Sequence, residues 1–566
     1  MSQKKWRKLR RENGEIVEKK EVVKEIGVRK ILKDNWKFLA VLCLGIVAIY
    51  FNGMWGGFVS DDYASITQNP EILDFGGTMK TVHIPAIANM MIAKIFGIES
   101  SIPYHAFNLF LFLLVCVMAF LFIFLLFDKT VAILTLIIFA FHPVHVEAVS
   151  WVSGRPYLLT TVFVLVAIVG GLLYLIKRNK KYVLVLLLNL GLMFFTDKIR
   201  GFSFFLLVVL VAICFKDEYF KSFNFSKIIL YFIASLVVIG IFAYPMALRR
   251  ITAVNSGYNA SESVFYNPSF QYPTAVSKYL QLLVVPVDLT LYHTMYIFPV
   301  WLNWMIFILY LSSLVYFFLK NKRVFFALAF IFMVTAPSMM PVKVSWLVAE
   351  RYIFFGSLGF CLLLGIILEN IWRKQKLVAV GFLGILVAGG ATRVVLRNID
   401  WQTNHKLWVN TCQVSPNSHN AWNNIGDDYD KLKQYDNAIK GFSQSTVIKP
   451  NYADAYHNRA NIFFKIGRLD LARDSYNTTL YYSSTLYQTY ISLTQIDLIE
   501  KKFDLALTHA QKAVELQPGN PQAIYVLGVV NAQMGNKQEA RKIFESILND
   551  FPNFQMARQA LFELGR

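Results

Sequence analysis

Hydrophobic residues follow two patterns along the chain, and the change between them comes near residue 397. From about residue 37 to 397, runs of Leu, Ile, Val and Phe alternate with short polar clusters. A helix that crosses a membrane needs roughly 20 apolar residues, because the hydrocarbon core is about 30 Å thick. From residue 398 on, the composition is that of an ordinary soluble helical domain. The pattern predicts an all-α chain, with a polytopic membrane helical bundle over 37–397 and a second domain over 398–566.

The apolar runs predict about eleven membrane spans, of which the fifth and sixth are short. A basic segment, 1–36, precedes the first of them. The expected spans are 37–54, 104–127, 130–147, 157–176, 182–196, 202–215, 228–247, 298–319, 324–340, 352–371 and 377–396.

The charge of the connectors alternates, which predicts the orientation of the chain. Lys and Arg concentrate in the N-terminal segment and in 177–181, 320–323 and 373–376, whereas the long connectors 55–103, 142–156 and 249–297 hold few. Cytoplasmic loops carry the excess of Lys and Arg, so we expect segment 1–36 to be cytoplasmic. An odd number of spans then places 398–566 on the extracytoplasmic side, in the bacterial periplasm or the lumen of the endoplasmic reticulum. This placement depends on the parity of the span count.

The second domain repeats itself with a period of about 34 residues, which is typical of tetratricopeptide repeats. Small residues recur where two helices approach, and large residues recur where they fill the gap between helices. The pattern predicts four repeats, with 401–416 as a partial leading unit and 555–565 as a terminal cap. The first unit carries Trp422, Ile425, Gly426, Tyr429, Ala438, Phe442 and Pro450, and shifts by one, two and three periods give Tyr456, Ala460, Phe463, Ala472 and Tyr476, then Tyr490, Ala506, Ala513 and Pro518, then Leu527, Gly528, Ala540 and Phe544.

The net charge of +20 does not alter the prediction of a membrane bundle followed by repeats. The basic residues lie at the ends of spans, as membrane orientation requires, so no nucleic-acid partner is expected. The five cysteines form no CxxC pair, and this argues against a zinc site or a disulfide framework.

Two adjacent acids follow the first span. Asp61 and Asp62 stand at the start of the connector 55–103. Carboxylates beside a membrane are costly to desolvate and are usually functional, and one of them could accept a proton from an attacking hydroxyl. The alternative is a solvated entry into a loop. Within the same connector, residues 85–98 form an amphipathic stretch that could lie at the membrane interface.

A polar cluster lies between the third and fourth spans. His142, His145, Glu147 and Arg155 fall within 14 residues. Two histidines three residues apart could bind a metal, but the segment supplies too few further ligands, so we favour hydrogen bonding to an anionic group. The planar fork of Arg155 suits a phosphate.

Weaker candidates lie elsewhere in the first domain. Lys198 and Arg200 lie between two short spans, on a side where cations would be odd without an anion to bind. Glu350 and Arg351 open the tenth span. Asp288 and His293, in the long connector, could equally be orientation anchors.

Together these features resemble the transmembrane and tetratricopeptide-repeat-containing O-mannosyltransferases and their bacterial relatives, over nearly the whole chain after residue 36. The most specific piece is the stretch from His142 to Arg155, which is similar to that family's signature HPVHxEAVxWVSGR. The family's Ser-Lys-Glu-x-Gly element is present as residues 197–201, which keep Lys198 but have Ile199 at the position of the acid. No role of that acid can therefore be carried over.

The resemblance implies a glycosyltransferase C type fold and the inverting transfer of a hexose, mannose in the family, from a polyprenyl-phosphate donor to protein Ser/Thr hydroxyls. Membrane lipids and a polypeptide acceptor are the expected partners, and a divalent metal is possible but not required. The alternatives are a lipid or glycan acceptor on the same fold, or a non-catalytic scaffold that docks peptides. The implied roles are Asp61 or Asp62 as base, His142, His145, Glu147, Arg155, Lys198, Arg200, Glu350 and Arg351 around the donor phosphate, and Trp422, Asn423, Tyr456 and Asn458 at the acceptor.

Overall fold

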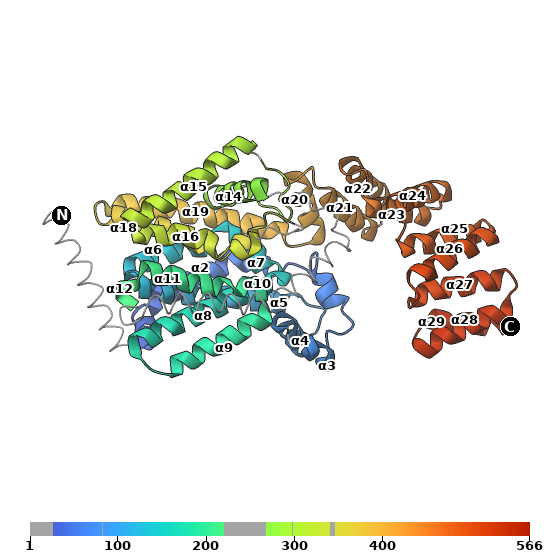
Figure 1. The fold of residues 1–566 in the computed structure, drawn as a ribbon, viewed down its shortest axis with the longest axis horizontal. Coiled ribbons are helices and arrows are strands. Elements are labelled where there is room, and N and C mark those ends of the chain that lie inside the picture. The colour runs from blue at the N-terminus through green and yellow to red at the C-terminus, as the bar shows by residue number, and fades with distance from the viewer. Residues whose placement is uncertain (1–26, 82, 220–267, 297, 340–345, 566) are drawn as a thin grey trace. The chain divides into compact units, whose positions relative to one another are not determined.

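The computed structural model describes residues 27–81, 83–219, 268–296, 298–339 and 346–565. These residues form helices and no strand (Figure 1). Contacts divide the chain into two compact units, Met1–Asn410 and Thr411–Arg566, which are described separately. The predicted span 228–247 lies outside the described residues.

The first unit is a bundle of apolar helices joined by short helical turns. Its elements are α2 (Trp36–Tyr50), η1 (Phe51–Gly53), η2 (Tyr63–Thr67), α3 (Phe75–Thr81), α4 (Ile84–Phe96), α5 (Ile102–Leu126), α6 (Lys129–Ala140), η3 (Pro143–His145), α7 (Val146–Ser150), η4 (Val152–Gly154), α8 (Arg155–Lys177), α9 (Lys181–Thr196), α10 (Lys198–Gly201), α11 (Ser203–Cys214), α12 (Lys216–Tyr219), α14 (Pro268–Val284), α15 (Val300–Lys320), α16 (Lys322–Met333), η5 (Ala336–Met339), α17 (Glu350–Ile353), α18 (Ser357–Trp372), α19 (Lys376–Asp400) and α20 (Asn404–Val414).

Among the residues of this unit that the structure describes, five stretches are long and apolar enough to cross a membrane: Trp36–Gly53, Ile102–Leu126, Val152–Lys177, Val300–Lys320 and Lys376–Asp400. A sixth crossing is possible if α6 and the segment Pro143–Ser150, bent by 59°, form one span. The expected count of eleven is therefore not confirmed. The physical reason is length, since α9, α11 and α18 are apolar helices of 10–17 residues, shorter than the core of a bilayer requires.

Polar residues at helix starts explain where two of these helices begin. The Asp128 carboxylate accepts a hydrogen bond from the backbone N–H of Val131 at 2.9 Å and so caps α6. Asn321 caps α16 in the same way, through the N–H groups of Arg323 and Val324. Each cap satisfies backbone donors that the first turn of a helix leaves unpaired.

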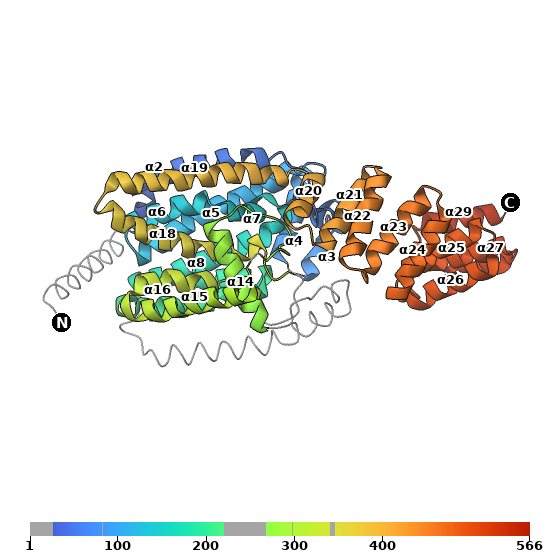
Figure 2. The ribbon, with the colours of Figure 1, turned by 90° about the horizontal axis from the view of Figure 1, so that it is seen from above.

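Glycines allow the central helices to approach closely. α18 packs against α6 and α16, and α19 runs beside α2 (Figure 2). A Cβ atom on Gly365 would lie 3.1 Å from the backbone nitrogen of Thr135, and one on Gly359 would lie 2.7 Å from the carbonyl oxygen of Ala327. Larger side chains at these two positions would push the helices apart.

The second unit is a row of helix pairs. The predicted four repeats and the terminal cap helix are confirmed. The boundary between the units falls within α20, which lies inside the predicted leading segment 401–416. The helices are α21 (His419–Lys431) with α22 (Tyr435–Ile448), α23 (Ala453–Lys465) with α24 (Leu469–Tyr482), α25 (Tyr487–Ile499) with α26 (Phe503–Leu516), α27 (Pro521–Gln533) with α28 (Lys537–Asp550), and α29 (Gln555–Leu564).

The repeat positions pack as their pattern predicts. The Phe442 ring lies so close to Gly426 that a Cβ atom there would meet it at 2.7 Å, and Phe544 lies against Gly528 in the same manner. Ala438 is fully buried between the helices of its pair. Since each pair buries an apolar face only against its neighbours, the array is stabilised by successive contacts along its length.

We expect Gly365→Leu to destabilise the first unit, because the added side chain cannot fit beside Thr135. Overpacking of this kind typically costs about 1–3 kcal/mol. Thermal unfolding in detergent measures the effect. The matched control is Gly384→Leu on α19, where a Cβ atom meets nothing within 4 Å. Equal melting temperatures for the two variants would contradict this account of the packing.

Candidate functional site

Asp62 joins the first long connector to the segment after α7. One carboxylate oxygen, Oδ1, accepts hydrogen bonds from the backbone N–H of Ser153 at 2.8 Å and from its hydroxyl at 2.5 Å. The other, Oδ2, accepts from the backbone N–H of Val59 at 3.1 Å. The side chain is completely buried. Burial raises the pKa of Asp62 to about 6, although the three hydrogen bonds act in the opposite direction.

Asp61 has the opposite environment. It is exposed, while its neighbour is buried. The preceding residue, Ser60, has a φ of 51°, a left-handed backbone conformation that non-glycine residues seldom adopt. The Ser60 N–H is held by the side chain of Asn404 at 3.0 Å. A strained backbone fixed by distant contacts commonly marks a functional position, and here it sets Asp61 and Asp62 in different surroundings.

Glu147 and Arg351 form a buried ion pair between α7 and α17. Glu147 Oε1 binds the guanidinium Nη1 of Arg351, and Glu147 Oε2 accepts from the backbone N–H of Arg351 at 2.8 Å. The Glu147 side chain is fully buried, and that of Arg351 is 9% exposed. Because the carboxylate engages both backbone and side chain, it fixes the direction of the guanidinium.

Two arginines from different elements converge on one phenol oxygen. Arg351 Nε donates to the Tyr157 hydroxyl at 3.2 Å, and Arg200 Nη2 donates to the same oxygen at 2.6 Å. The Arg200 guanidinium lies 3.8 Å from the centre of the Tyr157 ring, and it forms an ion pair with Asp197. The Tyr352 ring stacks on Tyr157 with 6.1 Å between centroids. This arrangement gathers cationic donors as an anionic group of a ligand would require.

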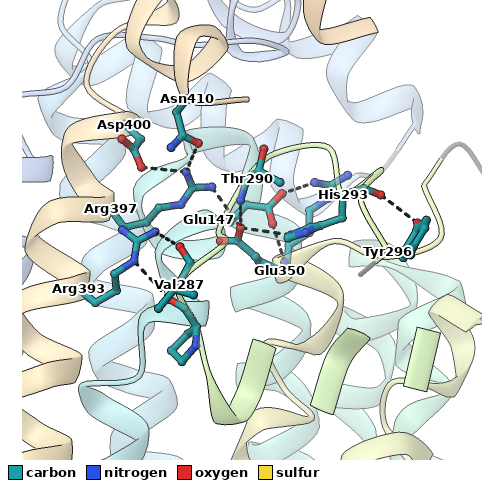
Figure 3. A network of polar contacts seen from close by, with 12 residues as sticks. Glu147, Val287, Thr290, His293, Tyr296, Glu350, Arg393, Arg397, Asp400 and Asn410 are labelled. Carbon is teal, nitrogen blue, oxygen red and sulfur yellow. Dashed lines mark hydrogen bonds and ion pairs between the residues drawn. The ribbon is translucent and has the colours of Figure 1, made fainter. Parts of the chain in front are cut away.

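Glu350 points away from this pair into a second network (Figure 3). Glu350 Oε1 accepts from the backbone N–H of Thr290 at 2.6 Å and from Arg397 at 3.2 Å, and His293 Nε2 lies 3.4 Å away. Burial acts to raise the pKa of Glu350, but the charge of Arg397 and the contacts with His293 and Thr290 outweigh it and lower the pKa. Adjacent residues, Glu350 and Arg351, therefore anchor opposite sides of α17.

Arg397 connects Glu350 to the end of α19 and to α20. Its Nη1 atom donates to Asp400 and to Asn410, both at 3.0 Å. One turn earlier, Arg393 donates to the backbone carbonyls of Pro286 and Val287 (Figure 3). These contacts fix the 286–293 loop beside α17.

The two predicted histidines are engaged in packing. His142 Nε2 lies 3.0 Å from the carbonyl oxygen of Leu283, and His145 Nε2 lies 2.7 Å from the Ser357 hydroxyl. The His145 ring is fully buried, 4.3 Å from the ring centroid of Phe139. Their contacts hold α14 and α18 against the turn after α6. Within the described ranges, no group of three or more His, Cys, Asp or Glu side chains could hold a metal ion.

Arg155 is also directed at protein atoms. Its guanidinium donates to the side chain of Asn108 at 3.0 Å, to the carbonyl of Tyr104 at 3.2 Å and to the side chain of Asn89. It is 1% exposed. Arg155 thus ties α8 to α5 and to the amphipathic helix α4. Lys198 begins α10, but its side chain lies outside the described part of the chain.

The signature stretch itself brings these groups together. Ser153 contacts Asp62, Glu147 contacts Arg351, and the Trp151 ring lies 5.3 Å from the Arg351 guanidinium. Sequence reasoning missed Tyr157 and Arg397. Tyr157 could have been considered a candidate because it lies two residues after the signature. The sequence marks Arg397 only as a residue at the end of an apolar run.

In the repeats, two of the four predicted acceptor residues contact each other. Asn458 Nδ2 donates to Asn423 Oδ1 at 3.1 Å, across adjacent repeats. Trp422 instead donates to the carbonyl of Pro416, and the Tyr456 ring stacks on Tyr482.

Comparisons with known proteins match both parts of the chain. Models of the "Tetratricopeptide repeat" match residues 453–484 and 497–561, and a "TPR repeat" model matches 426–467. Protein O-mannosyl-transferase TMTC3 of Mus musculus is 24% identical over an alignment of 509 residues, and the match covers 79% of this chain and 55% of that protein. The Homo sapiens protein of the same name is 23% identical over 508 residues, 78% and 54%. The chain thus spans about half the length of these relatives.

Among solved structures, MamA is 19% identical and covers 28% of this chain and 92% of its own, with a TM-score of 0.25. The alignments with the two mannosyl-transferases extend well beyond the repeats into the membrane unit, since they cover more than three quarters of the chain. The chain is therefore a relative of the transmembrane and tetratricopeptide-repeat-containing protein O-mannosyl-transferases.

Proposed function

We propose that this protein transfers mannose from a polyprenyl-phosphate donor to Ser/Thr hydroxyls of polypeptides on the extracytoplasmic side of a membrane, with inversion at the sugar carbon. The observation that carries the proposal is the convergence of Arg200 and Arg351 on the Tyr157 hydroxyl, 2.6 and 3.2 Å away. Two guanidiniums placed in this way suit a phosphate ester, whose oxygens take the place of the phenol as acceptors. The names of the relatives support the sugar and the acceptor.

The reaction needs one base and one stabilised leaving group. The hydroxyl oxygen of the acceptor attacks the sugar carbon, its proton passes to a carboxylate, and the bond from that carbon to the phosphate oxygen breaks. Negative charge grows on the departing phosphate, and the two guanidiniums offset it. Phosphate leaves without a proton donor, so a divalent metal is not required, although one could assist.

Within this proposal the two acids have separate roles. Asp61 is the base, because its carboxylate is exposed and Asp62 is committed to Ser153 and Val59. Asp62 is a positioning residue that holds the connector against the signature stretch. Glu147 positions Arg351 in the same sense. His142, His145 and Arg155 hold the surrounding helices, and Glu350 anchors α17.

Asp61→Asn should reduce transfer by about 10²–10⁴-fold, the usual contribution of a general base. The fold should survive, because Asp61 is exposed. Transfer of labelled mannose to a peptide measures the effect. Glu99→Gln removes an exposed carboxylate from the same connector and should leave transfer unchanged. Full activity of Asp61→Asn would assign the base elsewhere.

The raised pKa of Asp62 predicts opposite pH dependences for stability and activity. The folded-state pKa, about 6, exceeds the ordinary 3.8, so the stability that this group contributes is greatest below about pH 4 and is lost as the pH rises through 6. Transfer should instead increase through pH 6, because the ionised carboxylate accepts all three hydrogen bonds. We expect Asp62→Asn to be slower and to lack this rise in kcat/KM. An unchanged pH profile in that variant would exclude Asp62 as its source.

Arg200→Gln should raise the donor KM about 10–100-fold, which corresponds to the loss of one charge-assisted hydrogen bond. Arg200 is the better test of the pair, because removal of the Arg351 side chain would leave the buried Glu147 without an opposite charge beside it. Initial rates at varied concentrations of a short-chain polyprenyl-phosphate mannose give the KM. Arg373→Gln, at the far end of α18, is the matched control with 60% side-chain exposure. Equal donor KM values for the two variants would remove Arg200 from the phosphate site.

A further inference from the structure

The Tyr157 hydroxyl has one hydrogen-bonding group that its contacts with the arginines leave unused. A phenol oxygen accepts two hydrogen bonds and donates one. Both acceptor positions are taken, by Arg200 Nη2 at 2.6 Å and by Arg351 Nε at 3.2 Å. Among the residues that the structure describes, none accepts the phenol proton. The O–H group is therefore available to a ligand.

Both arginines are fixed by the same double contact with an acid. Glu147 accepts from the backbone N–H of Arg351 at 2.8 Å and pairs with its Nη1 atom. Asp197 accepts from the backbone N–H of Arg200 at 2.9 Å and pairs with its Nη1 atom. Each acid takes Nη1 and leaves Nε and Nη2 to other partners. In Arg200 the Nε atom is buried, and no described residue accepts a hydrogen bond from it. A ligand can therefore take donors from both guanidiniums while the acids keep them in place.

The Tyr157 ring is held independently of its hydroxyl. The Tyr352 ring stacks on it with 6.1 Å between centroids, and the Arg200 guanidinium lies 3.8 Å from its centre. Stacking and cation–π contacts stabilise a ring whether or not its hydroxyl is hydrogen-bonded. The phenol oxygen therefore stays beside the arginines when a ligand takes their hydrogen bonds.

The charge on the phosphate differs between the two ends of the proposed transfer. The donor is a phosphodiester with one negative charge, whereas the departing polyprenyl phosphate is a monoester that approaches a charge of −2. A hydrogen bond to an ionised acceptor is about twice as strong as one between neutral groups. A hydrogen-bond donor that faces the growing charge therefore stabilises the transition state more than it stabilises the bound substrate.

We propose that the Tyr157 hydroxyl changes from acceptor to donor when the phosphate binds, and that it stabilises the second negative charge of the leaving group. The phosphate takes the hydrogen bonds of Arg200 and Arg351, and the freed phenol directs its O–H at a phosphate oxygen. The bond from the sugar carbon breaks with its electron pair on the departing oxygen, and the phenol keeps its proton throughout. This role of Tyr157 rests on the proposed function.

The test is Tyr157→Phe in the full-length protein in lipid nanodiscs, with a short-chain polyprenyl-phosphate mannose as donor. The rate of a single turnover, measured with enzyme in excess, should fall about 10–100-fold, which corresponds to one hydrogen bond to a charged group. The donor KM should change less than threefold. Tyr174→Phe removes the hydroxyl of a half-buried tyrosine near the other end of α8 and should change neither quantity. Equal rates for the two variants, or a KM that rises as much as the rate falls, would overturn the proposal.

Binding of the leaving group gives a readout that does not depend on transfer. A short-chain polyprenyl monophosphate can carry the second charge, and its methyl ester cannot. In Tyr157→Phe, titration calorimetry should show that the Kd of the monophosphate rises at least tenfold, whereas the Kd of the methyl ester changes less than threefold. Equal changes for the two ligands would contradict the proposal, because displaced arginines would weaken the binding of both.

A second replacement keeps the hydroxyl and so does not depend on the folding of the Phe variant. With 3-fluorotyrosine in place of Tyr157, the ¹⁹F resonance reports on the surroundings of the phenol. The monophosphate should shift this resonance more than its methyl ester does. A resonance that moves equally with both ligands, or with neither, would refute the contact between phenol and phosphate.

The unaltered protein separates the two proposals. Failure of the unaltered protein to transfer mannose from this donor would overturn the proposed function, while the Kd and ¹⁹F measurements would still decide the contact between Tyr157 and the phosphate. Transfer by the unaltered protein, together with a full single-turnover rate in Tyr157→Phe, would overturn the further inference alone.

Discussion

A charge can stay ionised inside an apolar bundle only if an opposite charge is fixed beside it, and α17 is built on that constraint. Glu350 and Arg351 are adjacent in sequence, yet each has its own buried partner, Arg397 on one side and Glu147 on the other. Removal of one partner would leave an uncompensated charge in a medium that solvates it poorly. The two pairs together fix both the position and the rotation of α17, and hence the direction in which the Arg351 guanidinium points.

The signature stretch, from His142 to Arg155, makes three contacts that organise the candidate site. It supplies the partner of Arg351 through Glu147, a ring against the same guanidinium through Trp151, and the hydrogen bonds to Asp62 through Ser153. A single short segment therefore sets the geometry of both the acidic connector and the arginine pair. These groups are held in place by protein contacts alone, and for the proposed transfer such prior organisation is the condition for electrostatic stabilisation of a transition state.

Periodicity made much of the architecture predictable from the sequence. The repeats were predictable because Gly426 with Phe442, and Gly528 with Phe544, must recur wherever two helices touch. The span count was not, because a hydrophobic run does not reveal whether its helix will reach 12 residues, as in α16, or 25, as in α19. The candidate site was likewise predictable only in part. The sequence marks Asp61 and Asp62 equally as candidates. The contact between Asp62 and Ser153, 91 residues away, distinguishes them, because it belongs to the buried acid. The guanidinium of Arg155 suits a phosphate by its chemistry, but it donates hydrogen bonds to Asn108 and Tyr104, which the sequence does not place beside it.

The bonds from Arg397 to Glu350 and to Asn410 have a consequence for how such a protein can change over evolutionary time. They fix the register of the joint between α19 and α20, so a residue gained or lost there would rotate the helix and separate both contacts. In the repeat array, each pair of helices contacts only its neighbours. Whole repeats can therefore be added or removed without changing that joint. The number of repeats can thus change without disturbing these contacts, whereas the length of the joint between α19 and α20 cannot.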